Sequence, residues 1–180
     1  MEFIKRLFGL VQEDNNDIYQ SFLDDYLHSD DFKFWLELTG REQDDVKFMI
    51  FCEDEDEDEV DYDFLQLEVL KFNLFNYLRV NGYLDTLIDK YCKYVFIDEY
   101  NDINDDKFKK ELSVFYEKKA VEIIFYINNN VDKKFLTPET KHYFIPDSFV
   151  KMSKEDQDDC KYWIIALINM IVSKIVVSQT

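Results

Sequence analysis

The densest group of ionisable side chains in this sequence is an unbroken run of carboxylates, Glu53-Asp54-Glu55-Asp56-Glu57-Asp58-Glu59, and Asp61 and Asp63 follow it. Carboxylate oxygens are the ligands that calcium prefers, so a calcium loop is the first chemistry to consider. An EF-hand loop also needs a glycine at its sharp turn, and neither Glu53–Asp63 nor Asp98–Lys109 contains one. We therefore expect weak, non-specific condensation of cations on the run, with no dedicated metal site and no cofactor.

Acid–base catalysis is the next chemistry to consider. Histidine is the residue type most often used as an acid or base at neutral pH, but neither His28 nor His142 lies in a recognisable motif. The triplet Glu117-Lys118-Lys119 has the residue types of a restriction-type nuclease site, yet its surroundings have helical spacing where such a site requires a strand. The chain has no GxGxxG, Walker, GxSxG or HExxH motif. The sequence therefore indicates a protein that is not an enzyme, with no catalytic residues.

The net negative charge of the chain comes from one region. Residues 13–68 hold 21 Asp and Glu against Lys33, Arg41 and Lys47, and the rest of the chain holds 18 acidic and 18 basic residues, so the net charge of −18 belongs to this region. Seven adjacent like charges repel one another and oppose compact folding, unless they are solvated or face a cationic partner. Because phosphate binding requires a net basic surface, direct binding of nucleic acid is not expected.

The composition predicts a folded domain despite this charge. Hydrophobic residues make up 47% of the 180 residues and aromatic residues 17%, whereas the chain has only three Gly and two Pro. A chain of this length can bury about 70% of its unfolded surface in one core. With no internal repeat and no linker, we predict one domain over residues 1–180, with an acidic loop at about 53–63.

The cysteines and the N-terminal residues indicate a cytoplasmic protein. Cys52, Cys92 and Cys160 are widely spaced and form no CxxC pair, which favours reduced, buried thiols. The stretch MEFIKRLFGLVQED lacks the continuous apolar core of a secretory signal. The apolar segment Tyr162–Val177 is shorter than the roughly 20 residues of a spanning helix, so we predict a core helix there and no membrane association.

The N-terminal third is predicted to contain both helices and strands. Helical spacing covers Phe3–Val11 and Asp17–His28. The segments Phe32–Leu38 (FKFWLEL) and Val46–Cys52 (VKFMIFC) each have an apolar residue at every second position, which predicts the two strands of a hairpin. Leu65–Val69 (LQLEV) alternates again and would add a third strand with the acidic run as its loop, although the same residues also fit a helical stripe.

The remainder is predicted to be helical. Helical stripes run over residues 84–92 and 108–127, a polar loop covers 98–106, and Ser153–Asp156 resembles a capping box. The predicted fold class is therefore α+β, with an antiparallel hairpin or a small three-stranded sheet near the N-terminal third packed on a mainly helical remainder. An all-α fold is the alternative.

One short stretch resembles a known family. The residues of Ser21–Glu37, SFLDDYLHSDDFKFWLE, are similar to the start of a helix in RGS domains. The rest of the chain does not follow the RGS pattern, so this resemblance implies no function for the chain.

The acidic region predicts a protein that binds a basic partner. Opposite charge steers association, and strongly basic clefts belong mostly to proteins that handle nucleic acid. We predict an inhibitor of such a protein. Because the charge occupies about a third of the chain, the pattern favours an immunity protein that acts as the antitoxin of a nuclease toxin. A phage-type DNA mimic that blocks a restriction or CRISPR effector is one alternative. A helical module that binds a partner helix in an apolar groove is another.

The predicted partner-binding residues are acidic, with one aromatic anchor. Trp35 takes the anchor role if it faces out of the predicted sheet, because buried aromatic side chains dominate interface energies. The full set is Trp35, Asp44, Asp45, Asp54, Glu55, Asp56, Glu57, Asp58 and Asp61. The sequence leaves the identity of the target and the oligomeric state open.

Overall fold

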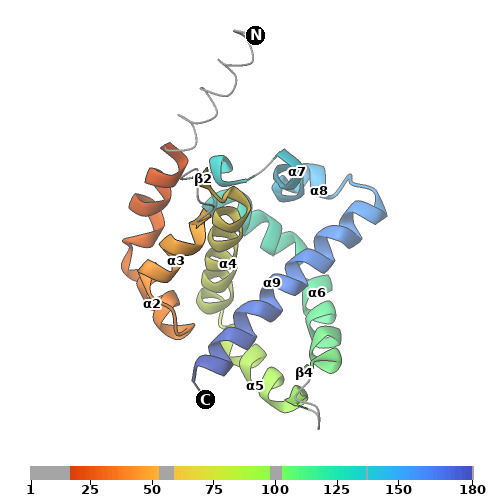
Figure 1. The fold of residues 1–180 in the computed structure, drawn as a ribbon. Coiled ribbons are helices and arrows are strands. Elements are labelled where there is room, and N and C mark those ends of the chain that lie inside the picture. Colours follow the sequence, from red (N-terminus) through yellow and green to blue (C-terminus); the bar gives the residue numbers. More distant parts are fainter. Residues whose placement is uncertain (1–16, 53–58, 98–102, 137, 180) are drawn as a thin grey trace.

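Helices build almost all of the described chain in the computed structural model (Figure 1). The structure describes residues 17–52, 59–97, 103–136 and 138–179. The α-helices are a first turn over residues 17–22, α2 (Asp30–Leu38), α3 (Gln43–Ile50), α4 (Tyr62–Val80), α5 (Leu84–Tyr94), α6 (Asp106–Asn130), α7 (Pro138–Lys141), α8 (Pro146–Phe149) and α9 (Lys154–Ser178). A π-helix, η1 (Leu23–Leu27), and two 3₁₀ turns, η2 (Lys133–Phe135) and η3 (His142–Phe144), complete the helical segments.

The strands of the described residues are each two residues long. They form two separate antiparallel pairs, β1 (Phe51–Cys52) with β2 (Glu59–Val60) and β3 (Phe96–Ile97) with β4 (Ile103–Asn104). Neither pair provides a face on which helices could pack. The α+β prediction is therefore wrong, and the alternative all-α fold is the one that the chain adopts.

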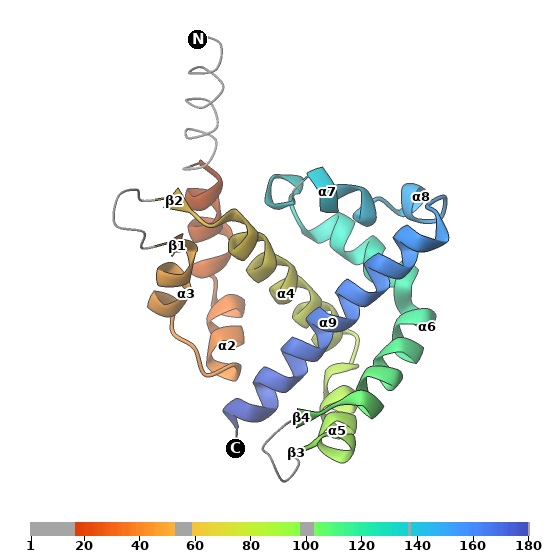
Figure 2. The ribbon, with the colours of Figure 1, turned by 45° about the vertical axis from the view of Figure 1, so that its right-hand side comes forward.

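Helix α4 lies at the centre of the fold. The N-terminal helices lie on one side of it and α6 on the other, in both views of the molecule (Figures 1 and 2). Helices α2, α3, α5, α6 and α9 all contact α4. Twelve of the 19 residues of α4 are buried, among them the charged Glu68 and Lys71. A helix that is buried on nearly every side has no single apolar stripe, and this explains why Leu65–Val69 also matched a strand pattern.

Helix α9 contains the segment that the sequence predicts as a core helix. It packs against α4, α5 and α6, and its buried side chains include Ile164, Leu167, Ile168 and Ile171. By length and composition it is the one described helix that could cross a membrane, with a mean hydropathy of 1.7 in an 18-residue window of which 44% is buried in the fold. One side of α9 is thus used in packing against the other helices.

The first predicted strand, Phe32–Leu38, is the helix α2. Its N-terminus is capped by Ser29, whose Oγ accepts a hydrogen bond from the Phe32 amide at 3.2 Å. Phe32, Trp35 and Leu36 are buried at the spacing of one helix face, whereas Phe34 is 39% exposed. The buried residues are spaced as one face of a helix requires, so the alternation of apolar residues did not reflect a strand.

The second predicted strand, Val46–Cys52, is mostly the helix α3. Val46 and Ile50 are buried four residues apart and fix α3 to the rest of the fold, and only Phe51 and Cys52 have strand geometry. The predicted acidic loop at 53–63 is also shorter than expected, since Glu59–Val60 is β2 and α4 begins at Tyr62. Residues 53–58, the predicted helix Phe3–Val11 and residues 98–102 of the predicted polar loop lie outside the described residues.

The C-terminal predictions are largely confirmed. Helices α5 and α6 cover the predicted helical stripes, and Ser153 caps α9 by accepting a hydrogen bond from the Asp156 amide at 3.1 Å. The cysteine prediction holds only in part. Cys160 is buried, and burial raises the pKa of its thiol to about 11, but Cys92 is exposed.

Candidate partner-binding surface

The described residues 17–50 form an acidic layer on one side of α4 (Figure 1). They contain nine Asp and Glu against Lys33, Arg41 and Lys47. All nine carboxylates are exposed: Asp17, Asp24, Asp25, Asp30, Asp31, Glu37, Glu42, Asp44 and Asp45. Because none of them is buried, their charge acts on the solvent and on any molecule that approaches this side.

Few cations neutralise the acidic layer. Asp25, Asp30, Asp31 and Asp44 form ion pairs of 2.9–3.5 Å with lysine or arginine, and the other five carboxylates have no ion-pair partner among the described residues. Exposed ion pairs of this kind contribute about 0–1 kcal/mol each. With nine carboxylates against three cations of its own, the layer keeps a net negative charge.

Arg41, one of the three cations of the layer, is turned toward the interior. Its Nη1 donates to Glu68 Oε2 at 3.0 Å, and its guanidinium lies 5.5 Å from the centre of the Trp35 ring. Glu68 is fully buried in α4 and also forms an ion pair with Lys71. Arg41 thus fixes the segment between α2 and α3 to the central helix and does little to neutralise the surface.

The outward side of α3 combines carboxylates with apolar side chains. Asp44 lies one helical turn from Phe48, and Asp45 lies one turn from Met49. Phe48 is 58% exposed and Met49 is 53% exposed. We call these four residues the α3 face. An apolar centre with a charged rim is typical of protein interfaces, in which aromatic residues and methionine are enriched.

Sequence reasoning found the carboxylates of the α3 face and missed its apolar residues. The strand pattern grouped Phe48 with Val46 and Ile50 on one side of the predicted strand. In a helix, Phe48 lies about 200° around the axis from Val46, so it points away from the core. The helical spacing of Val46 and Ile50 is the signal that could have identified Phe48 as an exposed residue.

Trp35 is not available as an anchor. It is 1% exposed, and its ring packs against Phe75 with 4.9 Å between the ring centres. The condition for its expected role, an outward-facing position in a sheet, is not met. Phe48 and Met49 replace it as the apolar residues beside Asp44 and Asp45.

Asp61 has a structural role at the start of α4. Its Oδ1 accepts a hydrogen bond from the Phe64 amide at 2.9 Å, and its own amide donates to the Ile50 carbonyl at 2.6 Å. The second bond joins the end of α3 to the start of α4. Of the remaining predicted residues, Asp54, Glu55, Asp56, Glu57 and Asp58 lie outside the described residues, and Cys52 and Glu59 on either side of residues 53–58 pair in the β1–β2 ladder.

We predict that Asp61→Ala destabilises the protein by about 1 kcal/mol, because the mutant loses the side-chain cap of α4. Asp61→Asn is the matched control, since asparagine caps helices about as well as aspartate and removes only the charge. Urea unfolding followed by circular dichroism measures both variants. Equal stability of the alanine variant and the wild type would contradict the capping role.

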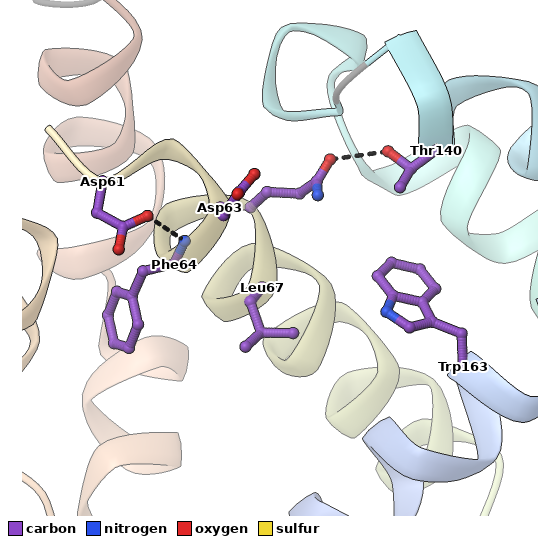
Figure 3. Close-up of a pocket in the computed structure, with 7 residues that line it drawn as sticks. Asp61, Asp63, Phe64, Leu67, Thr140 and Trp163 are labelled. Atoms are coloured by element: carbon purple, nitrogen blue, oxygen red, sulfur yellow. Dashed lines mark hydrogen bonds between the residues drawn. The ribbon is translucent and has the colours of Figure 1, made fainter.

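A groove lies next to the start of α4, between α4, α7 and α9 (Figure 3). It has a volume of about 570 Å³ and is lined by Asp61, Asp63, Phe64, Gln66, Leu67, Thr140 and Trp163. Trp163 on α9 faces Leu67 on α4 across the groove, and Thr140 Oγ1 donates to Gln66 Oε1 at 2.8 Å. We call this the α4–α9 groove. Its side walls are apolar and one end is acidic.

Comparisons with known proteins give no family for this chain. No protein-family model, no curated protein and no solved structure matches it. Among the described residues, no group of three or more His, Cys, Asp and Glu side chains is placed to hold a metal ion.

Proposed function

We propose that this protein binds a basic protein through the acidic layer and the α3 face and thereby inhibits it. The observation that supports the proposal best is the arrangement of the acidic layer, where nine exposed carboxylates meet few cations and adjoin the exposed Phe48 and Met49. The five carboxylates without an ion-pair partner among the described residues are available to a partner's lysine and arginine side chains.

The two parts of the surface have different physical roles. Exposed carboxylates steer a basic partner and raise the association rate by roughly 10- to 1,000-fold at low salt. Apolar side chains that become buried on binding mainly slow dissociation, because most affinity differences between related complexes lie in the dissociation rate. A surface with both properties suits a tight inhibitor of a nucleic-acid-handling protein.

We infer the class of target from the position of the acidic residues in the fold. The acidic layer occupies one side of the fold, and α6 on the other side carries four acidic and five basic residues. This one-sided charge supports an immunity protein, which blocks one cleft of a nuclease toxin. A phage-type DNA mimic that blocks a restriction or CRISPR effector would more naturally spread charge along the molecule, and it is the alternative target class.

Affinity capture from the host lysate at low salt tests the proposal. The test variant carries Asp44→Asn and Asp45→Asn together with Gln or Asn in place of residues 53–59. We expect a basic protein that the wild type retains, that the variant loses, and that moderate salt releases, because the Debye length is only about 10 Å at 0.1 M. The captured protein's own activity should fall when wild-type protein is added.

A matched control separates local charge from general charge. Asp44→Asn with Asp45→Asn, made without the changes at residues 53–59, removes two exposed carboxylates from the α3 face, and Asp85→Asn with Asp89→Asn removes two from α5, outside the acidic layer. We expect the first pair to weaken capture and the second pair to leave it unchanged. Equal loss of capture in both variants would mean that net charge alone drives retention, and the acidic layer would then not be the binding surface.

One observation favours the helical-module alternative. A second groove of about 390 Å³ lies between α6 and α9, where Tyr162, Ile165, Ala166 and Met170 supply most of its wall. A partner that wild type and variant retain equally, with no effect of moderate salt, would place binding on such an apolar surface.

A further inference from the structure

We propose that the α4–α9 groove receives a single lysine or arginine side chain from the basic partner, with the cation against the Trp163 ring and near Asp63. This inference rests on the proposed function and adds the pocket that recognises one side chain of the partner. Electrostatic steering by the acidic layer does not depend on the position of any one residue of the partner. A pocket for one side chain would therefore distinguish between partners of similar charge.

The walls of the groove match the shape of a long cationic side chain. Leu67 and Trp163 face each other across it, so an aliphatic stem can lie between two apolar surfaces while its charged end stays near solvent. Trp163 is partly exposed and is held from one side by Phe144, with 5.9 Å between the ring centres. Tryptophan is the aromatic residue that binds cations best.

Phe64 is less suited to this role than Trp163. The Lys71 ammonium already lies 5.8 Å from the centre of the Phe64 ring. A second cation over the same ring would be repelled by the first. Among the lining residues, Trp163 is therefore the aromatic ring that an incoming cation would contact.

The charge of the groove also fits a cation. The described residues that line it include two aspartates and no lysine, arginine or histidine. Asp63 is exposed and has no ion-pair partner among the described residues, so its charge is available. The partial positive charge at the start of α4 is offset by the Asp61 cap and by Asp63 in the first turn.

One backbone hydrogen bond connects α3 with the edge of the groove. The hydrogen bond from the Asp61 amide to the Ile50 carbonyl joins the end of α3 to the edge of the groove, and Asp61 itself lines it. A single basic segment of the partner could therefore contact Phe48 and Met49 and place one side chain in the groove.

Nuclear magnetic resonance on the full chain tests this inference. The protein has two tryptophans, so its ¹⁵N–¹H spectrum contains two indole signals, and the Trp163→Phe variant assigns them. The probes are hexa-arginine and hexa-lysine, with hexa-glutamine as the uncharged control. We expect either cationic probe to shift the Trp163 indole signal in a saturable manner and to leave the signal of the buried Trp35 in place.

Two variants measure how much Asp63 and Trp163 each contribute to binding of the cationic probe. Asp63→Asn should weaken binding of the cationic probe by about 1.4- to 5-fold, as expected for one exposed ion pair. Trp163→Leu should weaken it by about 2- to 30-fold, the range for a cation against an aromatic ring. Because Asp63 is exposed, its variant should keep the wild-type spectrum and test the inference even if Trp163→Leu perturbs the fold.

The possible failures are distinguishable. If hexa-arginine shifts the backbone amides of Asp44 to Met49 and leaves the Trp163 indole unmoved, the groove is not the cation pocket and the acidic layer remains the binding surface. If it shifts neither set of signals, both the pocket and the proposed function are overturned. Unchanged affinity in both Asp63→Asn and Trp163→Leu would also overturn the pocket.

Discussion

Replacing Glu68 with alanine is expected to lower the free energy of unfolding by about 3–5 kcal/mol, the loss typical of a buried charge that is left without its partner. Glu68 is fully buried in α4, between Arg41 and Lys71, whose side chains are 19% and 11% exposed. The variant would leave two cations in a low-dielectric environment with no carboxylate. Guanidinium or urea unfolding, monitored by circular dichroism, measures the change.

Three further variants make this prediction specific. Glu68→Gln keeps the size of the side chain but removes its charge. It should lower the free energy of unfolding nearly as much as Glu68→Ala, because the two cations again lack a carboxylate. Replacing Arg41, Glu68 and Lys71 together with methionine should recover much of this loss, since an apolar cluster needs no charge compensation. Glu37→Ala removes an exposed carboxylate of α2 and should change stability by less than about 0.5 kcal/mol. A loss below about 1 kcal/mol in Glu68→Ala would contradict the buried cluster.

Phe32→Ala is expected to destabilise the protein by about 3–5 kcal/mol, as large-to-small substitutions of buried phenylalanine do. The Phe32 side chain is fully buried and contacts the rings of Phe22 and Phe72, with ring centres 5.8 Å and 4.9 Å apart. These contacts attach α2 to the first helical turn, residues 17–22, and to α4. The substitution should therefore also weaken partner binding, because α2 belongs to the acidic layer.

Phe34→Ala is the matched control for Phe32→Ala. Phe34 is the same residue type in the same helix, but it is 39% exposed, with its ring centre 6.3 Å from that of Phe75 and 5.4 Å from the Arg79 guanidinium. We expect it to cost about 1 kcal/mol, the usual size of a point-mutant effect. In a strand the two side chains would lie on one face and cost similar amounts. Nearly equal losses in the two variants would thus argue for the strand over the helix.

The N-terminal third could not be assigned correctly from apolar spacing alone. The sequence FKFWLEL places apolar residues at both alternate and helical positions, so periodicity could not distinguish the two structures. The deciding signal was the cap, because Ser29 followed by Asp30 and Asp31 is a helix start, with carboxylates favourably placed in the first turn. The C-terminal half was predicted well because Ser153 supplied an equally clear cap there.

The candidate surface was predictable only in its charge. Asp44 and Asp45 could be placed at the surface because unpaired carboxylates are rarely buried. The α4–α9 groove could not be predicted, since Asp63, Thr140 and Trp163 come together only when α4, α7 and α9 pack. Trp35 and Trp163 have similar apolar surroundings in the sequence, so composition could not show which one is buried.

The inward turn of Arg41 separates two kinds of residue in the N-terminal third. Arg41, Glu68 and Lys71 link this region to the core, whereas the carboxylates of the acidic layer are exposed and stabilise the fold little. Substitutions among the exposed carboxylates can therefore accumulate without unfolding the domain. If the acidic layer is the binding surface, related proteins can change their binding partner by exchanging its charged residues while the buried residues stay the same.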